Sequence, residues 1–447
     1  MNFLRFKIVS ALSIFVLFSC SNPEQKEVSH KTAAEQKAET KAPQVESKEA
    51  LLARAKKIHD EVITIDTHVD IDGPDYATEK IDPGIDHPDL KCDLVKMKKG
   101  GMDAVFLAVY VSQRDNFDKK TYAEIYDDAQ AKFDAIHRVF KMHPDQAEWA
   151  KTPDDVERIQ RTGKRAIAIG IENGYPVGDN LENLRKFYDR GARYITLSHN
   201  RHNQICDSSG PDTPKHNGLS DFGKQMVKEM NRLGIMCDAS HISEKSFYDL
   251  LEVSKAPIVV SHSGCSALNA HDRNLTDDQL RALKKNGGVI QIVALGSFLK
   301  KEPAEFEEAV EKLRTETGAP TWSEYSKMSE EEREKIKHKM EEFHRRRDEM
   351  QETAGWVDIT DFVNHIDHAV KVAGIDHVGI GTDFDGGAGI KGFNNHAEAL
   401  NVTVELVKRG YSAPEIKKIW GGNLLRVWRE VEKAAQSLRH PFYSSRF

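Results

Sequence analysis

Eight short runs of apolar, largely β-branched residues recur along the chain, and each has the length of a β-strand. They cover residues 62–66, 104–109, 166–171, 194–197, 235–238, 258–261, 289–293 and 378–382. Amphipathic stretches with helical periodicity separate nearly all of them, at 122–142, 152–162, 181–190, 220–233, 243–254, 276–285 and 358–373. Strands that alternate with helices predict a parallel sheet of the α/β class, and eight such units predict its closure into a TIM-like (β/α)8 barrel.

One segment interrupts this alternation between the seventh and the eighth predicted strands. Residues 300–353 are charged and poor in apolar side chains, and many Glu–Lys and Glu–Arg pairs stand there at helical spacing. The pattern predicts a charged helical insertion on the side of the barrel where the strands end. Two roles remain open for it: a solvated helical excursion, or a lid or subunit contact that shapes a pocket.

Six of the eight apolar runs lead into a residue that can bind a metal or transfer a proton. These residues are His68 and Asp70 after the first run, then Glu172, His199, His241 and His262 after the third to sixth, and Asp383 after the last. Parallel barrel strands all point their C-terminal ends at one face, so these side chains are expected to converge. Histidines and carboxylates gathered in this way suit one or two divalent ions, above all zinc. The pattern predicts a metallohydrolase.

Five of these residues are predicted metal ligands. His68 and Asp70 are two apart on an extended segment, so their side chains share one face. His241 and His262 each follow a serine at the ends of consecutive strands. Glu172 has no basic neighbour in sequence, and a carboxylate that bridges two metals would offset the cost of burying it. The alternative for Glu172 is a surface residue just past a strand.

The remaining candidates have less defined roles. His199 could be a further ligand, a group that polarises a substrate carbonyl, or a structural residue. Asp383 stands where a carboxylate could take a proton from a metal-bound water and deliver it to a leaving amine, and Asp385 competes for this role. Cys206 and Cys265 follow site residues closely, so a thiol ligand also stays open.

The composition indicates a large folded core and argues against some classes of binding partner. The chain has 447 residues, a net charge of −7 and 39% hydrophobic residues, enough for a large core. Its mild acidity and dispersed Lys and Arg argue against a nucleic-acid partner. After residue 20 no apolar run approaches the roughly 20 residues that span a bilayer.

The N-terminal segment predicts export and lipid anchoring. Residues 1–19 combine a basic start with a short apolar stretch, as in a signal peptide. The junction that follows reads Leu17-Phe18-Ser19-Cys20, which resembles a bacterial lipobox in which Cys20 is acylated. Residues 20–50 are polar and predict a flexible tether, and residues 51–447 are expected to form the metallohydrolase barrel. A lipid-anchored protein of the cell envelope, on the periplasmic or cell-surface side, is expected; the alternative is a plain signal peptide with a chance cysteine.

The motifs that surround these residues occur in a characteristic order. They are Ile65-Asp-Thr-His-Val-Asp70, Gly170-Ile-Glu-Asn-Gly174, Leu197-Ser-His199, Asp238-Ala-Ser-His241, Ser261-His-Ser263, Arg273-Asn274, Gly379-Ile-Gly-Thr-Asp-Phe-Asp-Gly386 and Gly421-Gly-Asn-Leu-Leu-Arg-Val427. Together they resemble the membrane dipeptidase (renal dipeptidase) family of zinc peptidases, over residues from about 55 to 435.

The resemblance implies hydrolysis of dipeptides by a hydroxide that bridges two zinc ions. It implies His68 and Asp70 on one zinc, His241 and His262 on the other, and Glu172 between them. It further implies that His199 contacts the substrate carbonyl region or the tetrahedral intermediate, that Arg273 holds the substrate carboxylate, and that Asp383 manages protons.

Two other functions stay open at this point. One is a metal-dependent amidohydrolase that acts on a non-peptide amide or lactam, against which Arg273 and Glu172 argue. The other is a lipoprotein that keeps the barrel as a binding module. The long charged insertion leaves pocket shape open. An N-terminal lipid would replace the C-terminal anchor of animal relatives, so their oligomer contacts cannot be transferred, and a homodimer stays an open prediction.

Overall fold

The structure is a computed structural model that describes residues 46–439, except 72, 326–327 and 329. The predicted signal peptide, Cys20 and nearly all of the predicted tether lie outside the described residues. The first described helix, α1 (Lys48–Glu61), begins after Ser47, whose side chain accepts a hydrogen bond from the Ala50 amide. The last residues of the predicted tether are therefore helical.

Eight parallel strands follow one another around the barrel in chain order. They are β1 (Ile65–Val69), β2 (Ala104–Tyr110), β4 (Arg165–Glu172), β5 (Ala192–Thr196), β6 (Met236–Asp238), β7 (Val259–Ser263), β8 (Val289–Ile292) and β9 (Val378–Ile380). Just beyond β9, the Asp383 amide donates to the His68 carbonyl at 2.9 Å, which brings the last strand back to the first. A short extra strand, β3 (Ala147–Trp149), pairs only with β4. The predicted TIM-like (β/α)8 barrel is confirmed.

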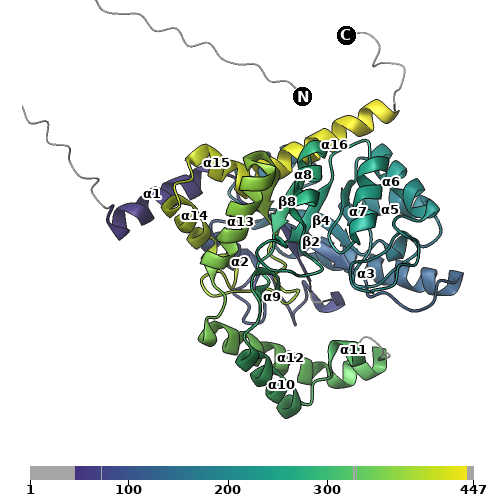
Figure 1. The fold of residues 1–447 in the computed structure, drawn as a ribbon, viewed down its shortest axis with the longest axis horizontal. Coiled ribbons are helices and arrows are strands. Elements are labelled where there is room, and N and C mark those ends of the chain that lie inside the picture. The colour runs from purple at the N-terminus through teal and green to yellow at the C-terminus, as the bar shows by residue number, and fades with distance from the viewer. Residues whose placement is uncertain (1–45, 72, 326–327, 329, 440–447) are drawn as a thin grey trace, which may run out of the picture. The chain divides into compact units, whose positions relative to one another are not determined.

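Helices surround the strands (Figure 1). They include α2 (Leu94–Gly100), α3 (Lys119–Met142), α4 (Pro153–Gln160), α5 (Glu182–Arg190), α6 (Asp221–Leu233), α7 (Glu244–Val253), α8 (Asp277–Asn286), α13 (Ile359–Ala373), α14 (Ala399–Lys408), α15 (Ala413–Lys417) and α16 (Asn423–Arg439). Thr152, Thr276 and Asp358 begin α4, α8 and α13 with capping boxes that satisfy the first backbone amides.

The strands bury both faces, and β4 shows how. Ile167, Ile169 and Ile171 join the apolar layer between strands and helices, whereas Ala166 and Ala168 join a second cluster inside the barrel. This second cluster includes α16 residues such as Trp428, whose ring centroid lies 5.3 Å from that of Phe106. Helix α16 therefore packs onto the barrel interior from the end opposite to the strand C-termini, and it runs along the upper edge of Figure 1.

The charged segment between β8 and β9 forms α9 (Gly296–Leu299), α10 (Ala304–Thr317), α11 (Trp322–Tyr325) and α12 (Glu330–Ala354), which confirms its helical prediction. Helices α10 and α12 pack together along the lower edge of Figure 1, away from α16. Lys91 forms an ion pair with Asp348 at 2.6 Å, and Gln351 Nε2 donates to the Gly389 carbonyl at 2.5 Å. These contacts fasten the insertion to the segment before α2, through Lys91, and to the loop after β9, through Gly389.

Strand β1 lies three residues later than the predicted 62–66, so His68 is inside the strand and not beyond it. Among the described residues, no helix has both the length and the apolar character that crossing a membrane requires.

Candidate metal centre and active site

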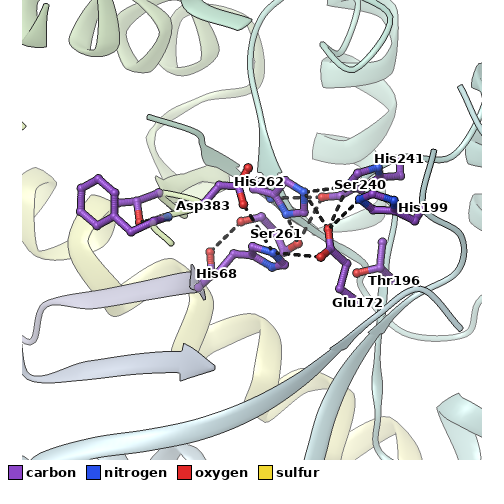
Figure 2. Close-up of polar contacts among 12 residues, drawn as sticks. His68, Glu172, Thr196, His199, Ser240, His241, Ser261, His262 and Asp383 are labelled. Carbon is purple, nitrogen blue, oxygen red and sulfur yellow. Dashed lines mark hydrogen bonds and ion pairs between the residues drawn. The ribbon is translucent and has the colours of Figure 1, made fainter. Parts of the chain in front are cut away.

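The predicted site residues come together at the C-terminal end of the barrel. His68 and His262 lie within β1 and β7, and Glu172 is the last residue of β4. Asp70, His199, His241 and Asp383 follow β1, β5, β6 and β9, and Arg273 lies in the loop between β7 and α8. Figure 2 shows six of these side chains, from His68, Glu172, His199, His241, His262 and Asp383, directed toward a common centre.

Glu172 lies at the middle of this cluster. Its Oε1 is 2.9 Å from His241 Nε2, 3.5 Å from His262 Nε2 and 3.7 Å from His199 Nε2. Its other oxygen, Oε2, is 3.7 Å from His68 Nε2. One carboxylate thus faces histidines on two sides, which is the position required of a bridging ligand.

The spacing of the donor atoms fits a metal. The Nε2 atoms of His241 and His262 are 2.9 Å apart, and both face Glu172 Oε1. The outer nitrogen of His241, Nδ1, meets the Asn200 side-chain oxygen at 2.9 Å, so Nδ1 donates and Nε2 carries a lone pair. Two ligands on one tetrahedral zinc, each about 2.1 Å from it, lie roughly 3.4 Å apart. Converging lone pairs at this spacing suit a cation.

A second group of candidate ligands is formed by His68, Asp70 and Asp383, whose ligand atoms lie within 4.8 Å of one another. Of the described residues, none makes a hydrogen bond to His68 Nε2 or to Asp70 Oδ1, although both atoms are buried. A Cβ added at Gly386 would lie 2.3 Å from an oxygen of Asp70 and 2.3 Å from one of Asp383, so glycine is needed where these carboxylates meet. His68 Nε2 and Asp70 Oδ1, buried and without a hydrogen-bond partner among the described residues, suit the role of ligands to a second metal ion.

The electrostatics of the cluster also favour a cation. Burial lowers the pKa of His68, but the charges of Glu172, Asp70 and Asp383 outweigh it and raise that pKa to about 10. Burial raises the pKa of Asp70 well above its usual range, and Glu172 adds to the effect. Burial, with help from the Arg273 charge, lowers the pKa values of His241 and His262 well below theirs. The neutral imidazoles of His241 and His262 are in the state that binds metal, and the carboxylates around His68 favour a positive charge there, which a bound cation would supply in place of the proton.

Asp383 rather than Asp385 faces the centre. Asp383 Oδ1 lies 3.9 Å from His68 Nε2, and burial raises the pKa of Asp383 to about 7. The Asp385 carboxylate accepts the backbone amides of Lys91 and Cys92 at 2.7 and 3.1 Å and is thereby engaged elsewhere. Both aspartates have a left-handed backbone, with φ of 66° for Asp383 and 62° for Asp385, so their side-chain contacts alone distinguish them.

His199 and Arg273 lie at the edge of the cluster. The ring centroid of His199 is 4.2 Å from that of His241 and 4.8 Å from that of Tyr110, and burial lowers the pKa of His199 to about 4. The Arg273 guanidinium carbon lies 5.2 Å from the ring centroid of Phe298. Its buried Nε and Nη2 meet no hydrogen-bond acceptor in the part of the chain that the structure describes. A polar ligand would satisfy them.

The thiol alternative finds no support. The candidate ligand groups among the described residues contain no cysteine. Burial raises the pKa of the Cys206 and Cys265 thiols to about 12, which disfavours the thiolate that a metal binds.

Several contacts of the ligands escaped the sequence reasoning. His68 Nδ1 is 2.8 Å from the hydroxyl of Tyr194, whose ring fills the space left by Gly170, where a Cβ would lie 2.1 Å from the ring. Ser261 Oγ is 2.9 Å from His262 Nδ1. The only signals of these contacts in the sequence were Gly170, two residues before Glu172, and Ser261, directly before His262. Neither identifies its partner.

Comparison with known proteins agrees with this geometry. The family model for membrane dipeptidases (peptidase family M19) matches residues 52–441. The chain is 34% identical to Dipeptidase tcpJ of Claviceps purpurea over 77% of this chain and 70% of the relative. It is 31% identical to Dipeptidase verJ of Clonostachys rogersoniana over 87% and 89% of the two chains.

Among solved structures, the probable dipeptidase PvdM from Pseudomonas aeruginosa superposes with a TM-score of 0.75 at 30% identity, over 87% of this chain and 100% of that one. The barrel, the clustered ligands and the match over most of the chain agree with one another. The chain belongs to the membrane dipeptidase family, peptidase family M19, and is a metallopeptidase.

Proposed function

We propose that this metallopeptidase is a dipeptidase that binds two zinc ions through His68, Asp70, Glu172, His241 and His262. The observation that carries the proposal is the convergence of His241 Nε2, His262 Nε2 and Glu172 Oε1 within 2.9–3.5 Å, next to the unpartnered donors of His68 and Asp70. Imidazole and carboxylate donors are the set that zinc prefers in hydrolases. Bound zinc supplies a Lewis acid and lowers the pKa of water.

The substrate's free carboxylate would pair with Arg273. Its guanidinium is buried over Phe298, and its Nε and Nη2 meet no acceptor among the described residues, so both nitrogens are available to an anion. A guanidinium matches a carboxylate with two parallel hydrogen bonds. This pairing would restrict the site to peptides whose C-terminal carboxylate lies one residue beyond the bond to be broken.

Two residues would act on the reacting groups. His199 is neutral, since burial lowers its pKa to about 4, and its place between Tyr110 and His241 suits a contact with the substrate carbonyl oxygen. Asp383 would take the proton from the attacking water and deliver it to the leaving amine. Its Oδ1 lies 3.9 Å from His68 Nε2, so the carboxylate borders the space that the water and the leaving group would share.

For the N-terminus, the lipobox-like sequence that ends in Cys20 supports anchoring to the bacterial cell envelope through an acylated cysteine. A homodimer stays a prediction.

A peptidase assay tests the proposed activity. The metal-stripped protein is loaded with zinc and offered dipeptides, tripeptides that share their sequences, and β-lactams. Zinc-dependent hydrolysis of dipeptides, with little turnover of tripeptides, is expected. Turnover of lactams without turnover of any dipeptide would contradict the proposal and favour the amidohydrolase alternative.

A further inference from the structure

Asp238, the last residue of β6, is a fully buried carboxylate at the centre of a hydrogen-bond network next to the ligand cluster. Its Oδ1 accepts the backbone amides of Ser240 and Ser261 at 3.0 and 2.8 Å. Its Oδ2 accepts the hydroxyls of Thr196 and Ser261, the latter at 2.6 Å. Four donors face two oxygens, so both oxygens act only as acceptors.

This arrangement fixes the direction of each hydrogen bond as far as His262. Ser261 has one hydroxyl hydrogen, and the Asp238 carboxylate takes it. Ser261 Oγ can then only accept from His262 Nδ1, which lies 2.9 Å away. The proton of a neutral His262 must therefore be on Nδ1, which leaves Nε2 bare and directed at Glu172 and His241.

A second serine completes the network consistently. The His262 backbone amide donates to Ser240 Oγ at 3.1 Å, and Ser240 Oγ lies 3.2 Å from Ser261 Oγ. Since Ser261 has no hydrogen left to give, the Ser240 hydroxyl donates to it. Ser261 thus gives one hydrogen bond and accepts two, and Figure 2 shows its contacts with Ser240 and His262.

We propose that Asp238 acts through Ser261 as a positioning residue that keeps His262 in the tautomer with a bare Nε2 and thereby sets the zinc affinity of the centre. The inference rests on the proposed function, in which His262 is a ligand. In many metal sites, a group that forms a hydrogen bond with the outer ring nitrogen of a ligand histidine fixes the tautomer and the orientation of that ring. Here the other two histidines meet different groups, since His68 faces the Tyr194 hydroxyl and His241 the Asn200 amide. Of these described ligands, His262 is the one tied to a carboxylate through a hydroxyl.

The isosteric change Asp238→Asn should reverse the chain of hydrogen bonds. The two backbone amides of Ser240 and Ser261 cannot turn around, so they retain the amide oxygen of the asparagine. Its NH2 group then faces the hydroxyls of Thr196 and Ser261, which rotate to accept. The Ser261 hydrogen becomes free to donate to His262 Nδ1, and this favours the tautomer with the proton on Nε2, which cannot bind a metal.

The experiment measures zinc affinity by competition with a chromogenic chelator, on protein whose folding is checked by circular dichroism and thermal unfolding. Removing an outer partner of a metal ligand typically costs 10- to 100-fold in affinity. We expect Ser261→Ala to lower the affinity for one of the two zinc ions about 10-fold, and Asp238→Asn to lower the affinity for the same ion about 100-fold. Thr196→Val removes a hydroxyl from Asp238 without reversing any bond, so this matched control should bind zinc as the wild type does.

The double variant distinguishes positioning from a merely structural role. In Asp238→Asn/Ser261→Ala the misdirected hydroxyl is gone, so zinc affinity should recover to that of Ser261→Ala alone. If the two losses simply add, or if Ser261→Ala binds zinc like the wild type, the relay through Ser261 is wrong. A wild-type protein that binds no zinc in the same assay would instead contradict the proposed function itself.

Discussion

Replacing Arg273 with methionine should abolish the preference for a free C-terminal carboxylate while leaving the metal centre intact. The Arg273 guanidinium is buried, and its Nε and Nη2 meet no acceptor in the described part of the chain. Burial also lowers its pKa to about 10, so the group is still charged at neutral pH. Methionine has a similar length and keeps the contact with Phe298 without the charge.

The size of the effect follows from the two unpartnered donors. A hydrogen bond that involves a charged group contributes about 1.5–3 kcal/mol, so two of them contribute about 3–6 kcal/mol. Since about 1.36 kcal/mol corresponds to a factor of ten in rate, Arg273→Met should lower kcat/KM for a dipeptide by about 10²- to 10⁴-fold. The guanidinium is already desolvated in the free protein, so little of this is lost to reorganisation.

The assay compares kcat/KM for a dipeptide and for its C-terminal amide, in wild type and variant, with zinc content measured in parallel. Wild type should strongly prefer the free acid, and Arg273→Met should treat the two alike with unchanged zinc content. Arg273→Lys is the matched control, because it keeps the charge but loses the two parallel N–H groups of the guanidinium. Its preference for the free acid over the amide should lie between those of wild type and Arg273→Met. If wild type hydrolyses acid and amide equally well, Arg273 is not the carboxylate-binding residue.

Three further predictions concern chemistry, stability and location. Asp383→Asn should leave the Kd for a non-hydrolysed dipeptide analogue within about threefold and lower kcat about 10²- to 10⁴-fold, because Asp383 is proposed to carry protons and is not one of the five proposed zinc ligands; an equal loss in binding, or a loss of bound zinc, would contradict this role. Removal of metal with a chelator should lower the Tm, and added zinc should restore it, because a ligand of the folded state alone stabilises that state; a Tm that does not respond would contradict a bound ion. Cys20→Ser should move the protein from the membrane fraction to the soluble fraction with hydrolysis intact, because stable anchoring needs acyl chains; unchanged membrane association would refute acylation at Cys20.

The fold and the candidate ligands could be predicted because each depends on a local pattern. In β4, isoleucines face the helices and alanines face the barrel interior, so the strand is visible as an apolar run that ends at Glu172. The barrel topology then brings such strand ends together, wherever they stand in sequence. The structure gathers His68, Asp70, Glu172, His199, His241, His262 and Asp383 in three overlapping groups.

What could not be predicted depends on partners that are distant in sequence. The first predicted strand ended at Asp66, whereas β1 continues to Val69. In the fold, however, Asp66 accepts hydrogen bonds from the backbone and hydroxyl of Thr382 and lies 2.7 Å from His396 Nε2, residues more than 300 positions away. The role of Asp238 was hidden in the same way, because the serine that links it to His262 is on the next strand.

The central claim is that one carboxylate, Glu172, joins two zinc sites. Elemental analysis of zinc-loaded, desalted protein tests it most directly, on wild type and on Glu172→Gln, whose neutral side chain keeps the shape and loses the charge. The wild type should hold two zinc ions per chain, and Glu172→Gln should lose affinity for both together. One tightly bound ion or none in the wild type, or a variant that loses a single ion and keeps the other at full affinity, would contradict the shared bridge.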